Sequence, residues 1–397
     1  MNMSGIVLSS SVRQNLLSLQ STADLLATTQ SRLATGKKVN TALDNPTNFF
    51  TAASLDNRAS DINNLLDGIS NGVQVLQAAN TGITSLQKLV DTAKSIAQQV
   101  LQAPVGYSTK SSVTSGANAG GTSANLLGAT LAQGDVLTIA ATGGGTASSI
   151  TFGTGAAEVN TLAELNTALA ANNLQASVND TTGAITITTT NDAASATVGA
   201  LGGTAAGAGK AFLAGSVTTV AAVADAASQA TRANLVAQYT NITAQITTTA
   251  QDASYNGINL LNGDNLKLTF NETGKSTLNI TGVTFNPAGL GLSTLVAGTD
   301  FLDSGSANRV ISSLSNASSL LRSQASSLGS NLSIVQIRQD FSKSLINVLQ
   351  TGSSNLTLAD TNEEAANSQA LSTRQSIAVS ALALANQSQQ SVLQLLR

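Results

Sequence analysis

Both ends of this chain carry apolar residues at alternating steps of four and three, the spacing of one narrow face of a coiled-coil helix. Gln30, Gln375 and Gln389 are the polar exceptions. Helices so poor in charge need a partner, so we predict that the two ends pack against each other and against copies of the same chain. The residues predicted to mediate self-assembly are Val12, Leu16, Leu19, Leu26, Leu33, Leu371, Ala378, Leu382, Val392, Leu395 and Leu396.

Composition narrows the class of function. Of 397 residues only 10% are charged, against about 25% in typical domains, and the net charge is −3. Weak net repulsion permits dense packing of like molecules. The chain has no Lys/Arg stripe for phosphates and few aromatic residues for stacking on bases, so we expect no nucleic-acid partner. Without Cys and His, disulfides, thiol chemistry and the usual zinc sites are excluded, and we expect no cofactor or metal.

Neither end of the sequence reads as a membrane or leader segment. The opening MNMSGIVLSS has no basic leader and no apolar run of sufficient length, so we expect no cleavable signal peptide. Residues 375–396 are uncharged, but several Asn and Gln amides would lie in lipid, so we expect no membrane span.

The N-terminal part predicts two helices. The first ends at Gly36, a residue that tolerates a left-handed helix end, and Asn45 with Pro46 supplies the cap and first residue of the next. Pro104 ends that second, long helix. Its predicted packing stripe includes Ile62, Leu66, Ile69, Val73, Leu76, Ile83 and Val90.

The middle of the chain, residues 104–225, changes to a small α+β pattern. Alternation predicts strands at 135–139 and 149–152, and Thr161 with Glu164 predicts a capping box. Residues 179–183 predict a hairpin turn. The glycine-rich runs around this segment predict loops.

Helical spacing resumes after Asp225, and alternation around 266–270 and 278–280 then predicts a β-hairpin. A long helix follows over 307–350, with Gly352 expected to break it, and Thr361 with Glu364 is expected to cap the last helix. Its predicted packing residues recur every seven positions: Leu314, Leu321, Leu328 and Val335.

Together these patterns predict a mainly α fold with β: a long helical hairpin or coiled-coil rod from both chain ends, a β-hairpin region, and an inserted small α+β domain. The predicted segments are 1–44 and 355–397 as terminal helices, 45–103, 226–300 and 301–354 as the rod, and 104–225 as the insert.

Catalytic interpretations are weak. The stretch 202–211 imitates a phosphate-binding loop, but Thr204 replaces the first required glycine and Ala211 follows Lys210, so a glycine-rich loop is the better interpretation. Residues 179–183 lack the length and terminal Glu of a calcium loop, which favours a turn. We therefore expect a protein that is not an enzyme.

Several motifs in fixed order resemble bacterial flagellin, the subunit of the flagellar filament. The matching segments are Ser31–Asn40, Asp67–Gly72, Ser254–Leu261, Gly289–Leu292 and Ala385–Arg397. The resemblance covers essentially the whole chain outside the insert. The segment Asn45–Phe50 is most similar to flagellins of alphaproteobacteria such as the rhizobial group.

The resemblance implies a structural subunit that self-assembles into the extracellular helical filament used for swimming. It implies terminal helices that form the inner tube and fold on assembly, a rod that contacts its neighbours, and an insert that is the surface-exposed variable domain. It also implies type III export with a chaperone, a filament cap and hook–filament junction proteins as partners.

The family's animal innate receptor reads a rod patch with two Arg followed by Glu in recognised members. The matching positions here are Thr92, Lys94 and Ser95, a departure that predicts weak recognition. The alternative is that these residues form only a solvated helix face.

Two other functions stay open at this point. A hook–filament junction protein shares the N-terminal pattern and often has a proline like Pro46. A type III secreted translocator with coiled-coil ends is the second alternative, although it would lack the flagellin-like ending.

Overall fold

Long helices dominate the computed structural model, which describes the backbone of residues 10–395 and their side chains except those of Ser11, Gln389 and residues 392–395. The chain divides into two compact units. The first holds the residues up to Asn71, Lys267–Leu278 and the residues from Ile334 onward, and the second holds Gly72–Leu266 and Asn279–Ser333. The mainly helical class with an inserted β-containing domain is confirmed.

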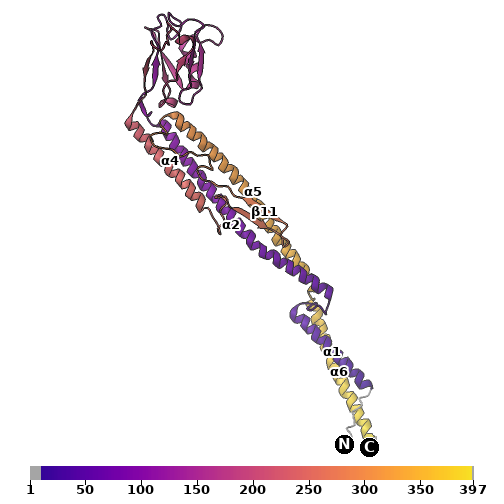
Figure 1. Ribbon diagram of the computed structural model, residues 1–397. Coiled ribbons are helices and arrows are strands. Elements are labelled where there is room, and N and C mark those ends of the chain that lie inside the picture. The colour runs from indigo at the N-terminus through magenta and orange to yellow at the C-terminus, as the bar shows by residue number, and fades with distance from the viewer. Residues whose placement is uncertain (1–9, 396–397) are drawn as a thin grey trace. The chain divides into compact units, whose positions relative to one another are not determined.

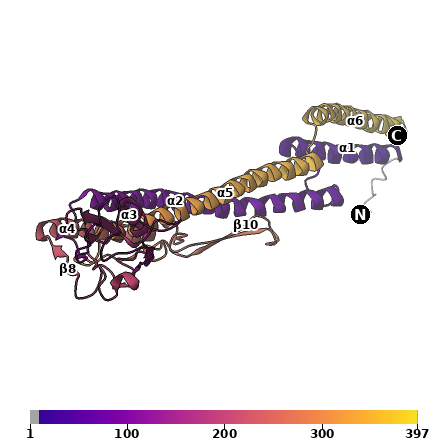
Figure 2. The same cartoon turned by 90° about the horizontal axis from the view of Figure 1, so that it is seen from above.

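The first unit contains the terminal helices α1 (Ser10–Thr35) and α6 (Thr361–Leu395), which lie side by side in both views (Figures 1 and 2). As predicted, α1 ends before Gly36, whose φ of 69° lies in the left-handed region that a side chain would strain. The next helix, α2 (Pro46–Gln102), begins at Pro46, and Asn45 caps it because its Oδ1 accepts a hydrogen bond from Asn48 N at 3.0 Å.

Two predicted helix boundaries in this unit are wrong. Helix α5 (Ser304–Thr357) continues through Gly352 to Thr357, because one glycine weakens a helix by only about 1 kcal/mol and packing overrides that cost. The cap of α6 is Asp360 instead of Thr361, since Asp360 Oδ1 accepts from Asn362 N at 2.9 Å and Glu363 N at 3.3 Å. Glu364 is thereby free to pair with Arg32.

The β-hairpin is present as predicted. Strands β10 (Asn265–Thr269) and β11 (Thr277–Thr281) form a two-stranded sheet. In the first unit the end of this hairpin is held by two contacts: Glu272 pairs with Arg58 of α2 at 2.7 Å, and Arg338 of α5 lies 5.7 Å from the centre of the Phe270 ring.

In the second unit, α2 packs along α4 (Ala226–Asp252), the helix that follows the insert (Figure 1). Asp225 caps α4, because its carboxylate accepts from Ser228 N at 2.9 Å. A side chain at Gly82 of α2 would lie 2.6 Å from atoms of Ala253 and Leu261, so glycine permits the close approach of this loop. The buried stripe of α4 includes Leu235, Tyr239, Thr243 and Ile246.

The insert of the second unit is built from short antiparallel strands. A four-stranded sheet has the order β5-β6-β2-β8, a three-stranded sheet has the order β4-β3-β7, and β1 pairs with β9 where the insert joins the helices. The strands are β1 (Tyr107–Thr109), β2 (Ser112–Thr114), β3 (Val136–Ile139), β4 (Ser148–Thr151), β5 (Leu174–Asn179), β6 (Ala184–Thr189), β7 (Leu201–Gly202), β8 (Thr218–Val220) and β9 (Val223–Ala224).

Helix α3 (Leu162–Leu169) covers the insert's core, and short 3-10 turns lie at Ala170–Asn172, Asn191–Ala193 and Thr204–Ala206. The predicted capping box is confirmed, with the Thr161 side chain accepting from Glu164 N and the Glu164 carboxylate accepting from Thr161 N. The predicted turn joins β5 and β6: Asn179 Oδ1 accepts from Thr181 N and Thr182 N. The insert encloses a core of its own, which includes Phe152, Leu165, Leu169, Ile185, Ile187 and Phe212.

Candidate assembly surfaces

Backbone hydrogen bonds join the segment that follows α1 to the segment that precedes α6. Where α1 turns back at Gly36, Lys38 N donates to Thr357 O at 2.7 Å and Ala359 N donates to Gly36 O at 3.0 Å. Arg32 adds an ion pair to Glu364, 3.4 Å away. One partner of this pair is partly exposed, so it contributes little stability. The two terminal helices are thus joined at their base, and the rest of their contact depends on apolar packing.

The predicted self-assembly residues of α1 are only partly covered. Val12 is buried and Leu19 and Leu26 are half-buried, but Leu16 and Leu33 remain 46% and 40% exposed. Two further leucines of α1 that were not predicted, Leu17 and Leu25, are more exposed still. One partner helix covers one stripe of α1 and leaves a second apolar surface open.

Helix α6 repeats this arrangement. Leu371, Ala378 and Leu382 are half-buried, as expected for a narrow seam against α1. The predicted Leu396 lies outside the described residues, and the side chains of Val392 and Leu395 are also outside the description. On its other faces, α6 exposes Ile377, Val379 and Leu384, the last at 72%. We refer to Leu16, Leu17, Leu25, Ile377, Val379 and Leu384 as the open terminal surface.

A second exposed apolar row lies on α5 in the same unit. Ile334, Ile337, Phe341 and Val348 are spaced by three, four and seven residues, so they share one face of the helix. Phe50 of α2 is also exposed. In contrast, a polar face would be expected if this part of the chain met only water.

The predicted rod-packing residues lie inward. Leu66 is half-buried, and the others are buried: Ile62, Ile69, Val73, Leu76, Ile83, Val90, Leu314, Leu321, Leu328 and Val335. In the first unit, Ile62 packs in a cluster with Ala59, Ile346 and Leu349.

The positions matched to the receptor patch lie on α2 in the second unit. Thr92 and Ser95 are exposed and Lys94 is half-buried. Thr92 Oγ1 donates to Lys88 O, one turn back, at 2.8 Å. No ion pair of Lys94 is found among the described residues.

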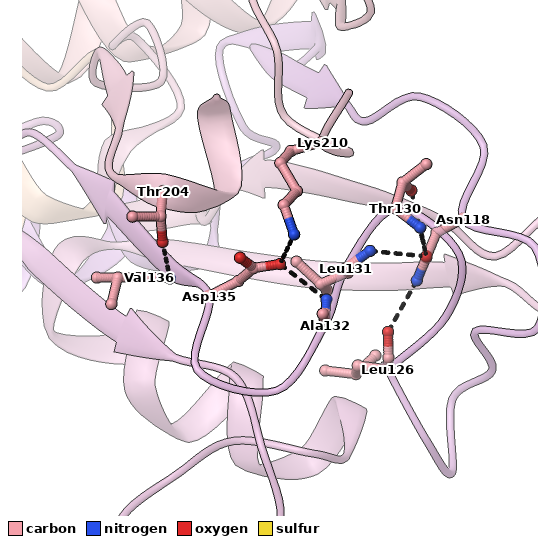
Figure 3. A network of polar contacts seen from close by, with 9 residues as sticks. All are labelled: Asn118, Leu126, Thr130, Leu131, Ala132, Asp135, Val136, Thr204 and Lys210. Atoms are coloured by element: carbon pink, nitrogen blue, oxygen red, sulfur yellow. Dashed lines mark hydrogen bonds and ion pairs between the residues drawn. The ribbon is translucent and has the colours of Figure 1, made fainter. Parts of the chain in front are cut away.

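The polar side chains of the glycine-rich stretch 202–211, which imitates a phosphate loop, pair with other groups of the insert (Figure 3). Lys210 Nζ pairs with Asp135 Oδ2 at 2.7 Å, and that oxygen also accepts from Ala132 N at 2.7 Å. Thr204 Oγ1 accepts from Val136 N at 2.7 Å. The lysine therefore neutralises a carboxylate of the fold, which agrees with the glycine-rich loop interpretation.

A buried asparagine next to this site fixes the adjacent loop (Figure 3). Asn118 is fully buried, its Oδ1 accepts from Thr130 N and Leu131 N, and its Nδ2 donates to Leu126 O at 2.8 Å. A side chain that satisfies its hydrogen bonds in this way stabilises one loop conformation.

Sequence reasoning missed the residue that joins the insert to the helices. Arg232 of α4 is 1% exposed and donates to Pro104 O at 2.8 Å, Phe301 O at 2.7 Å and Ala103 O at 3.4 Å. Burial lowers the pKa of its guanidinium, and Asp303 opposes that effect. The signal was present: Arg232 precedes Leu235 by three residues and is the one charge on the apolar stripe of α4.

Other groups complete this junction. Tyr239 stacks edge-on with Phe301 at 6.1 Å, and burial raises the pKa of Tyr239 to about 12. The insert also contacts the residue that precedes α5: Ser195 Oγ donates a hydrogen bond to Asp303 Oδ2 at 2.5 Å. We call this the second contact of the insert.

Neither a membrane helix nor a metal cluster is found in the part of the chain that the structure describes. Within residues 10–395, every helix is too short or too polar to cross a bilayer. The same residues contain no group of three or more carboxylates placed to bind a metal ion.

Comparison with known proteins gives matches at both ends. The family models for the bacterial flagellin N-terminal and C-terminal helical regions match residues 7–118 and 311–396. Flagellin FljM of Caulobacter vibrioides is 33% identical over 165 residues, which cover 41% of this chain and 59% of that protein. Flagellin FljO of the same organism is 32% identical over the same length, with the same coverage. Flagellin A of Rhizobium meliloti is 37% identical over 93 residues, covering 23% of this chain and 24% of the relative.

Proposed function

This chain belongs to the bacterial flagellin family, and we propose that it is a structural subunit that polymerises into the helical filament of the flagellum. In this proposal residues 1–44 and 355–397 form the inner tube. Residues 45–103, 226–300 and 301–354 form the rod, and 104–225 form a domain at the filament surface. The similarity to alphaproteobacterial flagellins supports the assignment, although the chain spans only 59% of the length of the Caulobacter relatives.

The open terminal surface is the observation that carries the proposal. A monomeric protein rarely exposes so many large apolar side chains on one helix pair. Leu17, Ile377 and Leu384 are 66%, 63% and 72% exposed, and their positions on two adjacent helices leave them free to contact other helices. Further copies of α1 and α6 would present the same kind of surface in return.

The energetics favour assembly over a stable free pair. Fully burying a Leu or Ile contributes about 1.5–3 kcal/mol. Ordering the backbone costs about 1–2 kcal/mol for each residue. A half-exposed seam gains only part of the free energy of burial, but ordering its backbone costs the full amount of conformational entropy. We therefore infer that contacts with neighbouring subunits supply the difference and that the ends become ordered when they assemble.

We extend the proposal to export and location. The subunit would leave the cell through the flagellar type III apparatus with a chaperone. It would then add to a filament that is bounded by a cap and by hook–filament junction proteins. The absence of Cys, together with only three prolines, suits a chain that must pass unfolded.

Seeded growth is the direct test of the proposal. Purified monomer added to short filament fragments should elongate them into long helical tubes, which electron microscopy would show. A hook–filament junction protein should bind fragments without elongating them, and a translocator should instead release dye from lipid vesicles. Either of those results would refute the filament-subunit assignment.

Proteolysis tests the coupling of order to assembly. Trypsin should remove the ends of the monomer, because in this proposal they are not ordered before assembly, and Arg13 and Arg374 provide cleavage sites there. The same sites should be protected in the polymer. Ends that resist trypsin in the monomer would show that the terminal helices are already stable alone.

A further inference from the structure

The two edge strands of the insert's four-stranded sheet, β5 and β8, differ in whether their outward backbone groups are hydrogen-bonded. On the β5 side, the Asn166 side chain of α3 takes the place of a neighbouring strand. Its Oδ1 accepts from Ala176 N at 2.6 Å, and its Nδ2 donates to Ala176 O at 3.2 Å. Another chain therefore cannot pair at the centre of this edge, and in that sense we call the β5 edge closed.

The register identifies which backbone groups remain open on the other edge, β8. Ser111 O accepts from Thr189 N, and Ser115 N donates to Ile185 O, so alternate residues 111, 113 and 115 face β6. Residues 112 and 114 then face β8, where they lie opposite residues 220 and 218. The N–H and C=O of Thr219 consequently point away from the sheet. No hydrogen bond to these two groups is found within the described residues.

The side chains of β8 also lack the usual protection. All three residues of the strand, Thr218, Thr219 and Val220, are exposed, and the whole segment 211–224 has no charged residue. A hollow of about 460 Å³ borders the strand and is lined by apolar side chains, among them Val113, Leu201, Phe212 and Val217. Edge strands commonly carry a lysine, a proline or a bulge that prevents pairing, and β8 has none of these.

We propose that β8 pairs antiparallel with β8 of a second copy of this chain, centred on Thr219. A two-fold axis at that residue brings the two Thr219 backbones opposite each other, so each N–H meets the other C=O. Threonine opposite threonine is a favourable cross-strand pair. With no charge in residues 211–224, the approach of two identical strands meets no local like-charge repulsion.

The pairing rests on the proposed function, because a three-residue strand is far smaller than the interface of a stable dimer. A filament that displays many copies would make many weak pairs act together. Subunits within one filament are arranged head to tail, and no two-fold axis relates neighbours. The pairs therefore join subunits of different filaments, and the result is lateral association of filaments into bundles.

The test uses filaments of the full chain and two substitutions at the centre of the pair. Thr219→Pro removes the outward N–H and leaves the pairing with β2 intact, because proline is tolerated where an edge strand's N–H faces solvent. Thr219→Lys adds a charge that opposes pairing. The matched control is Gln175→Lys, which adds the same charge on an exposed position of the closed β5 edge.

Low-speed sedimentation and electron microscopy of polymerised samples would measure bundling. We expect wild-type and Gln175→Lys filaments to bundle, and both Thr219 variants to reduce the bundled fraction by roughly tenfold, since many weak pairs are lost together. Circular dichroism of the monomers should show the same melting for wild type and Thr219→Lys. Normal single filaments from the wild-type chain, or equal bundling of the Thr219 variants, would overturn this inference alone. Failure to form filaments at all would overturn the proposed function as well.

Discussion

The insert and the terminal helix pair use the same uncharged residue types but reach opposite outcomes. In the insert, strands, α3 and loops surround Phe152, Leu165 and Ile185, which have no solvent exposure. In the terminal pair, α1 and α6 each cover one stripe of the other, and side chains such as Leu384 stay exposed. Two helices side by side cannot enclose a core, whereas packed sheets and a helix can. The comparison teaches that a region can be completed by its own chain or by its neighbours.

The largest effect is expected from a charge placed on the open terminal surface, because it tests whether neighbouring subunits bury this surface. Leu384→Asp should leave the monomer's stability within about 0.5 kcal/mol, because the site is exposed in the single chain. In the polymer an unpaired buried carboxylate costs about 3–5 kcal/mol, which raises the critical concentration by more than about a hundredfold. Sedimentation of seeded polymer would measure that concentration.

Leu384→Met is the matched control, since it keeps an apolar side chain of similar volume and should polymerise nearly as well as wild type. Polymerisation of the Asp variant at the wild-type critical concentration would show that this face of α6 stays in water.

The second prediction makes the same comparison from the side of the insert. Phe152→Ala should destabilise the insert by about 3–5 kcal/mol, because the ring is fully buried and leaves a cavity. Urea unfolding followed by circular dichroism would measure the loss, with Thr154→Ala at an exposed position as the control. Seeded growth should persist, because the open terminal surface is unchanged. Loss of growth without loss of insert stability would contradict the separation of the two regions.

The junction between insert and helices gives an effect of intermediate size. Arg232→Met removes the donor that serves the carbonyls of Pro104 and Phe301, and each buried acceptor left without a partner costs about 1–3 kcal/mol. We expect faster amide hydrogen exchange in β1 and β9, where the insert begins and ends. Arg322→Met, at an exposed position of α5, is the control. Unchanged exchange in β1 and β9 would show that the second contact, through Ser195 and Asp303, is sufficient.

The sequence predicted correctly those features that residues close together in the chain determine. The end of α1 at Gly36, the start of α2 at Pro46, the Thr161 capping box and the 179–183 turn are each decided by residues within a few positions, and all were predicted correctly. The α5 break at Gly352 was wrong because packing along a long helix outweighs the weak local preference of one glycine.

The functional surfaces were predictable only in part, for a physical reason. Helical periodicity shows which residues share a face, but it does not show how much of that face a partner covers. Leu16 and Leu19 belong to one predicted series, yet one is exposed and the other half-buried. The place of Arg232 on the apolar stripe of α4 indicates burial, but its partners Pro104 O and Phe301 O lie far away in the chain, and no local pattern identifies them. The residues predicted to mediate self-assembly therefore stay predictions until the polymer is tested.

The smallest expected effect concerns acid and the start of α4. Hydrogen bonds from the Ser228 hydroxyl and Ser228 N hold the pKa of Asp225 below its usual value. A carboxylate with a lowered pKa stabilises the fold above its unfolded pKa, and this contribution is lost as the pH falls from about 4 through the folded pKa.

Asp225→Asn keeps a capping oxygen but cannot titrate. The melting temperature of wild type should therefore exceed that of the variant near pH 7, where a negative charge favours the helix N-terminus, and the difference should shrink as the pH falls below about 4. Because Asp44 and Glu164 also have lowered pKa values and titrate in both proteins, only the difference between the two melting curves reports on Asp225. A difference that stays constant from pH 7 to pH 2 would show that the charge of Asp225 does not stabilise the junction where the insert returns to the helices.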